Sequence, residues 1–232
     1  MTFQARDVMR RVATTLQDQS NVRWPTLELL DYLNDGLREI VTIKPNAASK
    51  TVVLELDEGT LQTLPPEYTV LSRVSRNMAT LAVGAGAIRR LDSRSIMDSQ
   101  IPNWQDPARI PFAKTVVHVI HDIADPNTFY VAPGNDGTGM IEAVVGVIPE
   151  AIAAGGTDID TYTALVSLPD IYLNALADYV TYRAYSKDGR VAGSSARAQA
   201  HFELFRGSVT NFAQAETGMS LAASNDQAKE GN

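Results

Sequence analysis

Cysteine is missing from this chain of 232 residues. Its absence excludes disulfides, thiol catalysis, cysteine-bound zinc and iron–sulfur clusters. Apolar runs are short, and none reaches the roughly 18 to 20 residues that a membrane span requires. The opening Met1–Asp7 has neither the basic nor the apolar region of a secretory signal, so we expect no signal and no membrane partner.

Basic charge is also in short supply, with 20 lysines and arginines against 27 acidic residues and a net charge of -7. A protein that grips duplex DNA usually presents a basic face to the phosphates. The most basic stretch, Ile88–Arg94, holds three arginines and an aspartate. We therefore expect only non-specific proximity to DNA, which an acidic surface tolerates because like charges repel.

Catalytic and metal-binding motifs are absent as well. His118 and His121 are predicted on one strand, where residues three apart face opposite sides and cannot share a metal. His201 is expected on a helix surface. Asp158 and Asp160 lack the further ligands of a calcium loop, and a polar loop explains them adequately.

Two glycine clusters, Gly84–Ala87 and Gly134–Gly139, do not fit a phosphate-binding loop between a strand and a helix. Both lie between predicted strands, which favours hairpin turns. We therefore predict a non-enzymatic protein with no catalytic, cofactor-binding or metal-binding residues and no cofactor.

Helical periodicity is clear at both ends of the chain, whose apolar fraction of 44% is that of an ordinary globular protein. Helices are predicted over 3–18 and over 26–43, the second capped by Thr26. Ser167 is predicted to cap a third helix that ends near Lys187. A fourth follows from about Val191, with a narrow apolar seam formed by Ala198, Phe202, Phe205, Val209 and Phe212.

The middle of the chain has the period of two that is typical of strands. A hairpin is predicted around Asp57–Thr60, and a proline-rich loop over 101–111. A short helix is predicted over 93–99, and a three-stranded antiparallel meander later in the region. The predicted strands are 52–56, 61–64, 68–78, 88–91, 115–122, 128–132 and 140–148.

These patterns predict an α+β fold in which two N-terminal and two C-terminal helices form a body with a β-rich antiparallel insertion. The body comprises residues 1–48 and 165–217, and the insertion residues 49–164. Residues 218–232 are small and polar without periodicity, so we expect a disordered, flexible C-terminal tail.

Tyrosines and an arginine recur along 179–188. One interpretation is a helix whose tyrosine rings pack while their hydroxyls stay in water. The other is a protein interface, because tyrosine and arginine are enriched in binding hot spots. Both stay open, and the candidate interface residues are Tyr179, Tyr182, Arg183, Tyr185, Phe202, Phe205, Phe212, Trp104, Met219 and Leu221.

Several short motifs together resemble the head-to-tail adaptor proteins of tailed bacteriophages, also called connectors or head completion proteins. The resemblance covers roughly residues 20 to 215, and its motifs are individually weak. They are Trp24–Val41, Lys44–Ala47, Leu64–Pro65, Arg76–Asn77, Ala87–Arg89, Ile101–Trp104, Asp125–Val131, Leu168–Asp170 and Asp178–Asp188.

The resemblance implies a structural virion protein without an active site. Such proteins form homo-oligomeric rings, usually of about twelve copies, that dock beneath the portal protein, surround the DNA channel and contact a tail tube or nozzle protein. The implied location is the head–tail interface of a virion assembled in the host cytoplasm. Alternatives left open are another tail component, such as a tail terminator or nozzle subunit, and an enzyme or ligand-binding protein.

A closed ring requires two different contact faces on each subunit. The β-rich insertion and the helix carrying Phe202 and Phe212 are the candidates. We also expect the C-terminal tail to become ordered against a partner, with the portal as the candidate.

Overall fold

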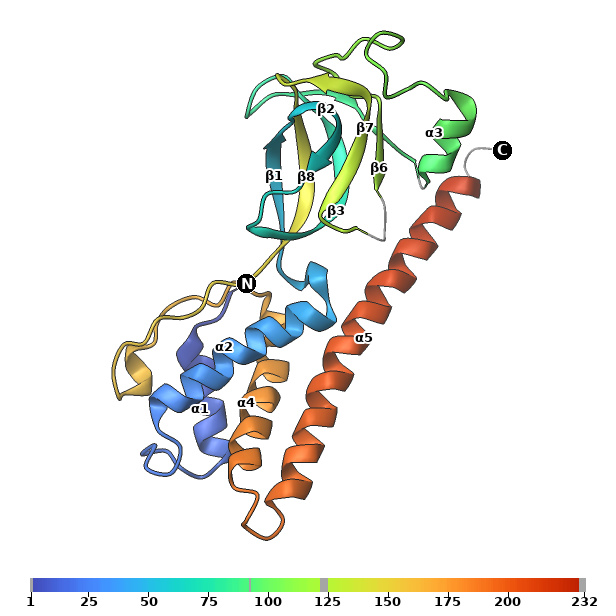
Figure 1. The fold of residues 1–232 in the computed structure, drawn as a ribbon. Coiled ribbons are helices and arrows are strands. Elements are labelled where there is room, and N and C mark those ends of the chain that lie inside the picture. The colour runs from blue at the N-terminus through green and yellow to red at the C-terminus, as the bar shows by residue number, and fades with distance from the viewer. Residues whose placement is uncertain (1, 92, 122–124, 230–232) are drawn as a thin grey trace. The chain divides into compact units, whose positions relative to one another are not determined.

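The computed structural model describes residues 2–91, 93–121 and 125–229, and the side chains of 213–229 lie outside that description. Its contacts divide the chain into two compact units (Figure 1). The first, the helical unit, contains the residues up to Ala47 and those from Pro149 onward. The second, the β unit, contains Ala48–Ile148. The α+β class predicted from the sequence is confirmed.

The helical unit contains α1 (Ala5–Thr15), α2 (Thr26–Ile43), α4 (Leu173–Lys187) and α5 (Ser194–Lys229). Each of these helices buries an apolar stripe against the others, as amphipathic helices must. Short 3-10 turns, η1 (Pro45–Ala48), η2 (Ile159–Thr161) and η3 (Asp170–Tyr172), accompany them. The fully buried side chains include Val8, Met9, Val12, Leu29, Leu33, Ile40, Leu176, Val180, Phe205 and Val209.

The segment 149–168 belongs with these helices, whereas the sequence placed residues 149–164 in the insertion. The side-chain amide of Asn34 pairs with the backbone of Ile152 as a neighbouring strand would. Its Oδ1 accepts from Ile152 N at 2.8 Å, and its Nδ2 donates to Ile152 O at 3.1 Å. Ala5 N donates to Ala164 O at 3.0 Å. The segment lacks helical periodicity, so only these backbone contacts reveal where it lies.

Helix ends differ from the sequence predictions at several points. Pro25 takes the N-cap position of α2, while the Thr26 hydroxyl donates to the Thr157 carbonyl. The helix expected after Ser167 begins as η3 and becomes α-helical only at Leu173, since Pro169 has extended backbone angles. The backbone of α5 continues to Lys229, where a flexible tail from residue 218 was predicted. Apart from Gly218, that stretch contains no strong helix breaker.

The β unit contains two four-stranded sheets (Figure 1). The first has the order β1-β8-β3-β4 and the second the order β2-β7-β6-β5. A short helix, α3 (Arg94–Gln100), follows β5, and the Ser93 hydroxyl caps it as the predicted helix over 93–99 requires. The strands are β1 (Ser49–Glu55), β2 (Glu58–Thr63), β3 (Tyr68–Met78), β4 (Gly84–Ala87), β5 (Arg89–Leu91), β6 (His118–His121), β7 (Thr128–Asp136) and β8 (Met140–Val147).

Both sheets contribute side chains to one apolar cluster, so the sheets pack face to face. Leu54, Leu71 and Ile141 come from the first sheet, and Val119 and Phe129 come from the second. Successive side chains of a strand point to opposite faces, so one face of each sheet can enter this core.

The strand pairing differs from the predicted hairpin and meander. β1 pairs with β8 and β2 with β7, so the turn at Asp57 carries the chain from one sheet to the other. Of the predicted meander, only β6 and β7 are antiparallel neighbours, and β5 pairs with β6 in parallel. Leu54 and Leu56 both enter the core shared by the sheets, and the chain crosses to the second sheet directly after them.

The two glycine clusters are also placed differently. Gly84–Ala87 forms β4, and the turn before it lies at Thr80–Val83. Gly134 lies inside β7, where a Cβ atom would come within 2.5 Å of the Phe112 ring. Close packing therefore requires Gly134, and the turn itself begins at Gly137, whose φ is 81°. In the described part of the chain, no helix has the length and apolar character to cross a bilayer.

Candidate interaction surfaces

Aromatic side chains of α4 and α5 meet in a contact that we call the aromatic seam, formed by Tyr179, Tyr182, Phe202 and Phe205. The ring centroids of Tyr179 and Phe205 are 5.0 Å apart, and those of Tyr182 and Phe202 are 4.9 Å apart. Tyr172 and Phe212 extend it with centroids 5.5 Å apart and nearly perpendicular rings. Edge-to-face pairs of this kind add to the burial of apolar area.

The candidate interface residues of α4 and α5 differ in exposure. Phe205 is 0% exposed, Tyr179 6% and Tyr185 9%, so these three rings are packed inside one subunit. Tyr182, Arg183, Phe202 and Phe212 are only partly buried, and a partner could still reach them. The side chains of Met219 and Leu221 lie outside the described residues.

Trp104, the candidate from the β unit, is 1% exposed. Its ring belongs to a second apolar cluster with Met97, Ile120 and Ala132. Its indole Nε1 donates to Asp98 Oδ1 at 2.8 Å. The tryptophan therefore anchors the proline-rich loop on the β unit through both its apolar body and its one polar atom.

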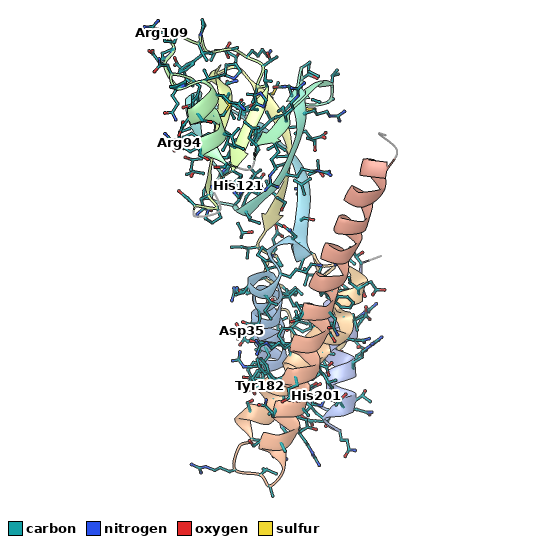
Figure 2. All side chains as sticks on the ribbon, turned by 90° about the vertical axis from the view of Figure 1, so that its right-hand side faces the viewer. Asp35, Arg94, Arg109, His121, Tyr182 and His201 are labelled. Atoms are coloured by element: carbon teal, nitrogen blue, oxygen red, sulfur yellow. The ribbon has the colours of Figure 1, made fainter. Side chains whose placement is uncertain are left out.

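Arg183 of α4 connects this helix to Asp35 of α2; Figure 2 labels Asp35 and Tyr182. Its Nη1 donates to Asp35 Oδ2 at 3.0 Å and to the Tyr179 hydroxyl at 3.2 Å. The guanidinium also lies 4.9 Å from the ring centre of Tyr32. Burial lowers the pKa of Arg183, but the hydrogen bonds to Tyr179 and Asp35 outweigh it, so the pKa is raised on balance.

A second polar chain joins the same helices. Glu28 accepts from the Tyr32 hydroxyl at 2.6 Å and also accepts from Lys187 Nζ. Burial together with the neighbouring carboxylate raises the pKa of Tyr32 to about 12. Burial works against the Glu28 carboxylate, yet the bonds from Lys187 and Tyr32 prevail and lower its pKa. These side chains hold α2 and α4 together.

The packing around Gly36 explains why α2 has a glycine at its centre. A Cβ atom there would lie 2.9 Å from Tyr179 Cδ1 and 3.1 Å from Leu176 Cδ2. The missing side chain lets α4 approach α2 closely. The sequence alone does not reveal this contact, because a helical period does not show which neighbour packs against the glycine.

His201 was expected on the helix surface but takes part in the contact between α4 and α5 (Figure 2). Its Nδ1 lies 2.9 Å from Asp178 Oδ1, and its ring stacks on Tyr185 with centroids 6.0 Å apart. The side chain is 23% exposed. It therefore links the two helices as a partly buried packing residue.

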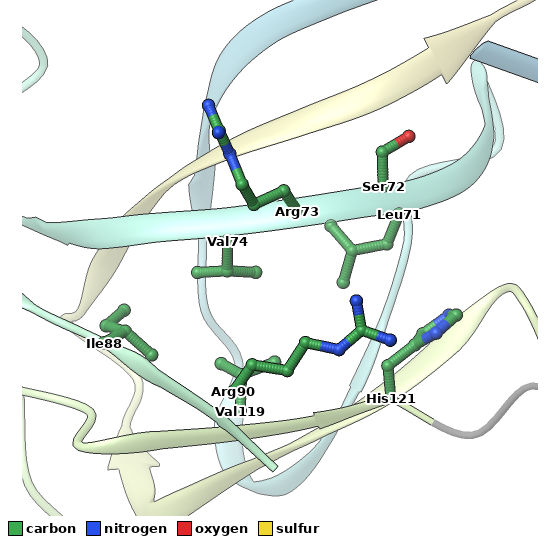
Figure 3. A pocket seen from close by; sticks show the side chains of 8 residues that line it. All are labelled: Leu71, Ser72, Arg73, Val74, Ile88, Arg90, Val119 and His121. Carbon is green, nitrogen blue, oxygen red and sulfur yellow. The ribbon is translucent and has the colours of Figure 1, made fainter. Parts of the chain in front are cut away.

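His118 and His121 both lie on β6, three residues apart, so they face opposite sides as expected. His121 points toward a cavity between β3, β5 and β6, which is also lined by Arg73, Val74 and Arg90 (Figure 3). Its volume is about 50 Å³. Ligand pockets usually have about 300 to 1,000 Å³, so the space suits water rather than a metabolite.

Asp158 and Asp160, the acidic pair of the 149–168 segment, already contact other groups of the protein. Asp158 caps η2 by accepting from Asp160 N at 2.9 Å, and Asp160 forms an ion pair with Arg10 on α1. Within the described ranges, no group of three or more metal-binding side chains lies together.

A family model described as SU10 adaptor protein matches residues 1–226. The chain belongs to this family. A search among curated proteins finds no match. The family is one of phage adaptor proteins, a structural class rather than a class of enzymes. The match spans both units, including residues 1–19 and 149–166, which carried little of the resemblance seen in the sequence.

In the β unit, buried asparagines that sequence reasoning missed hold irregular segments in place. Asn135 Nδ2 donates to the carbonyls of Ala113 and Lys114, both at 3.1 Å. Its Oδ1 accepts from Gly137 N at 2.9 Å and Gly139 N at 3.0 Å. No sequence pattern distinguishes such a residue from an ordinary turn asparagine.

Asn77 has a similar role on β3. Its Nδ2 donates to Val116 O at 2.8 Å and Gly86 O at 3.1 Å, while its Oδ1 accepts from Val116 N at 2.8 Å. The side chain thereby joins β3 to the segment before β6, where no ladder exists. Both amides satisfy backbone groups that would otherwise be buried without partners.

Proposed function

We propose that this chain is a structural virion subunit whose copies close into a ring between the portal protein and the tail of a phage. The observation that carries the proposal is the match to the adaptor family over residues 1–226, which includes both units. In this proposal the ring is homo-oligomeric and surrounds the DNA channel. Its lower face contacts a tail tube or nozzle protein. It joins the virion at the head–tail interface.

The charge of the chain supports a position beside moving DNA. With a net charge of -7, the subunit does not resemble a protein that neutralises phosphates along a duplex. Phosphates passing an acidic wall are repelled, which prevents sticking while a genome enters or leaves. Contact with DNA is accordingly non-specific.

The partly exposed members of the predicted interface, Tyr182, Arg183, Phe202 and Phe212, remain candidates for docking on the portal or the tail. They lie along one pair of helices, and their internal contacts already hold the rings in fixed positions. Pre-positioned side chains lose little conformational entropy when a partner binds.

The C-terminal part of α5 is the candidate contact for the portal. The helix runs on through residues 213–229 after Phe212, the last of its residues with a described ring contact. At 1.5 Å per residue these seventeen positions span roughly 25 Å. Such a length is sufficient to reach a second protein.

The experiment that tests the proposed function combines the purified chain with the portal protein of the same phage and images the complex by negative-stain electron microscopy. An adaptor adds a ring of density at the portal. A tail terminator or nozzle subunit instead leaves the portal unchanged and binds to tail assemblies, and that result would contradict the proposal.

A truncation then tests the C-terminal contact. A chain ending at Gly218 is expected to keep the far-UV circular dichroism of a folded subunit but to lose portal binding. As a matched control, Val22→Lys changes an exposed loop residue that is 81% exposed and should leave binding intact. Normal portal binding by the truncated chain would contradict the assignment of this contact.

A further inference from the structure

The longest run of the chain without a charged residue, Asn77–Ile88, belongs to the β unit. It contains the end of β3, the turn at Thr80–Val83 and the whole of β4. Leu81 is 70% exposed and Val83 56% exposed. Contiguous exposed apolar patches on a subunit often mark interaction sites.

β4 is also an edge strand, the last in the order β1-β8-β3-β4. One of its faces continues from Val83 through Ala85 and Ala87, all exposed. The opposite face carries Gly84 and Gly86. A Cβ atom at Gly84 would lie 2.7 Å from the Arg76 guanidinium, which pairs with Glu142 at 2.8 Å.

Natural sheets normally protect such an edge with lysine, proline, inward-pointing charge or a covering loop, because an open edge pairs with any available strand. β4 has small and apolar side chains and no charge or proline. The sequence and exposure of this edge therefore resemble a strand that is paired in the mature assembly.

The other side of the β unit has a complementary character. β1 connects to β2 through Leu56 and Asp57, and β4 connects to β5 through Ile88, so β1 and β2 lie at one end of the two sheets and β4 and β5 at the other. The exposed charged residues from β1 to β2 are Lys50, Glu55, Asp57 and Glu58, an acidic balance. β5 carries the exposed basic residues Arg89 and Arg90.

We infer that β4 pairs with β1 of a second copy of this chain, so that one hydrogen-bonded sheet continues from subunit to subunit. The inference rests on the proposed ring and names the contact that would build it. β1 and β4 are the two different edges of the same sheet, and a ring requires two different faces on every copy. The basic β5 of one copy then lies beside the acidic β1–β2 connection of the next.

The partner is a second copy rather than an unrelated peptide because this chain supplies both complementary edges. An unrelated strand need not bring acidic groups to the basic end of the sheets, whereas a second copy of this chain does. A pairing of β4 with itself would bring Arg89 and Arg90 of two copies together, which like charges disfavour. Head-to-tail pairing avoids that repulsion.

The absence of cysteine makes a site-specific crosslinking test clean. Ala85→Cys on β4 is combined with Thr51→Cys, at an exposed position in the middle of β1, and the assembled protein with its portal is treated with a short bis-maleimide reagent. The double variant is expected to give a ladder of covalent multimers. Each single variant should give no crosslinked species.

The outcomes separate this inference from the proposed function. A ring at the portal without crosslinking of the double variant overturns the β4–β1 contact and leaves the adaptor function standing. Dimers from Ala85→Cys alone would show β4 pairing with itself and would also overturn it. If the unmodified chain forms no ring with the portal, the proposed function fails, and this inference fails with it.

A second measurement does not depend on strand register. Val83→Lys places a charge on the apolar edge, and we expect the protein concentration needed for half-maximal ring formation to rise at least about tenfold. The control Leu204→Lys changes a residue of α5 that is 56% exposed and should shift that concentration less than about twofold. Far-UV circular dichroism verifies that both variants fold, and equal assembly by the two would contradict the inference.

Discussion

The helical unit and the β unit bury their apolar groups in different ways. In the helical unit, aromatic rings of α4 and α5 pack on each other, and Phe205 and Tyr179 are enclosed within the subunit. In the β unit, two sheets share one core, yet the run from Met78 to Ile88 leaves Leu81 and Val83 exposed. The aromatic residues of the helical unit are thus partly buried within the subunit, whereas an uncharged strand edge of the β unit is exposed.

The contrast shows that residue types enriched in hot spots do not by themselves locate an interface. Tyrosine, phenylalanine and arginine stabilise a helix pair as well as they stabilise a complex. What distinguishes the two roles is exposure in the single subunit. By that criterion the β4 edge is the stronger candidate for copy-to-copy contact, and Tyr182, Arg183, Phe202 and Phe212 are candidates for other partners.

The largest expected effect comes from Phe205→Ala in the aromatic seam. Removing a fully buried ring should cost about 3 to 5 kcal/mol of unfolding free energy, because it leaves a cavity between α4 and α5. Urea denaturation followed by far-UV circular dichroism measures it. The control Leu204→Ala removes an exposed side chain and should change the unfolding free energy by less than about 0.5 kcal/mol. Equal effects would show that the seam is not core.

A smaller effect is expected for Asn135→Ala in the β unit. The variant leaves the carbonyls of Ala113 and Lys114 and the amides of Gly137 and Gly139 without their partner. We expect a loss of about 2 to 4 kcal/mol in urea denaturation. Asn127→Ala, at an exposed turn position, is the control. An unchanged stability would mean that water replaces the amide and that Asn135 does not organise this turn.

Two glycine-to-alanine variants in the helical unit should change stability in opposite directions. Gly36→Ala places a methyl group against Tyr179 and Leu176 and should destabilise by about 1 to 3 kcal/mol. Gly207→Ala meets nothing within 4 Å and should stabilise α5 by about 0.5 to 1 kcal/mol. Thermal unfolding of both variants measures the difference. A stabilising Gly36→Ala would contradict the close approach of α2 and α4.

The smallest effect concerns pH. The pKa of Glu28 is lowered in the folded state, so its bonds to Lys187 and Tyr32 contribute stability above its ordinary pKa of 4.5 and lose it as pH falls through the lowered value. Lys187→Met should therefore destabilise at pH 7 by less than about 1 kcal/mol and make stability fall less steeply between pH 5 and pH 3. Urea denaturation across that range measures both. An identical pH dependence of the unfolding free energy in wild type and variant would show that the Glu28–Lys187 ion pair does not contribute to it.

Much of the helical unit could be predicted from the sequence because a 3.6-residue period encodes which face is buried. The span of α2 over Thr26–Ile43 and the end of α4 at Lys187 agree with the structure. The packing of Gly36 against Tyr179 could not be predicted, because it joins residues far apart in the chain.

Apart from β4, the strands of the β unit were predictable from the sequence, but their pairing was not. A period of two marks β1, yet it does not say that β8 lies between β1 and β3. The glycines of β4 suggested a turn, since the close packing of Gly84 against Arg76 depends on a neighbouring strand. For the same reason, the exposure of the β4 edge could be recognised only once the sheet order was known.

Hydrogen–deuterium exchange of the free chain and of the chain assembled with its portal distinguishes a copy-to-copy contact at the β4 edge from one at α4 and α5. We predict that assembly slows amide exchange in residues 78–88 and 49–55, while the buried α4–α5 contact around Tyr179 and Phe205 exchanges at the same rate in both states. Unchanged exchange in residues 78–88 after ring formation would contradict it.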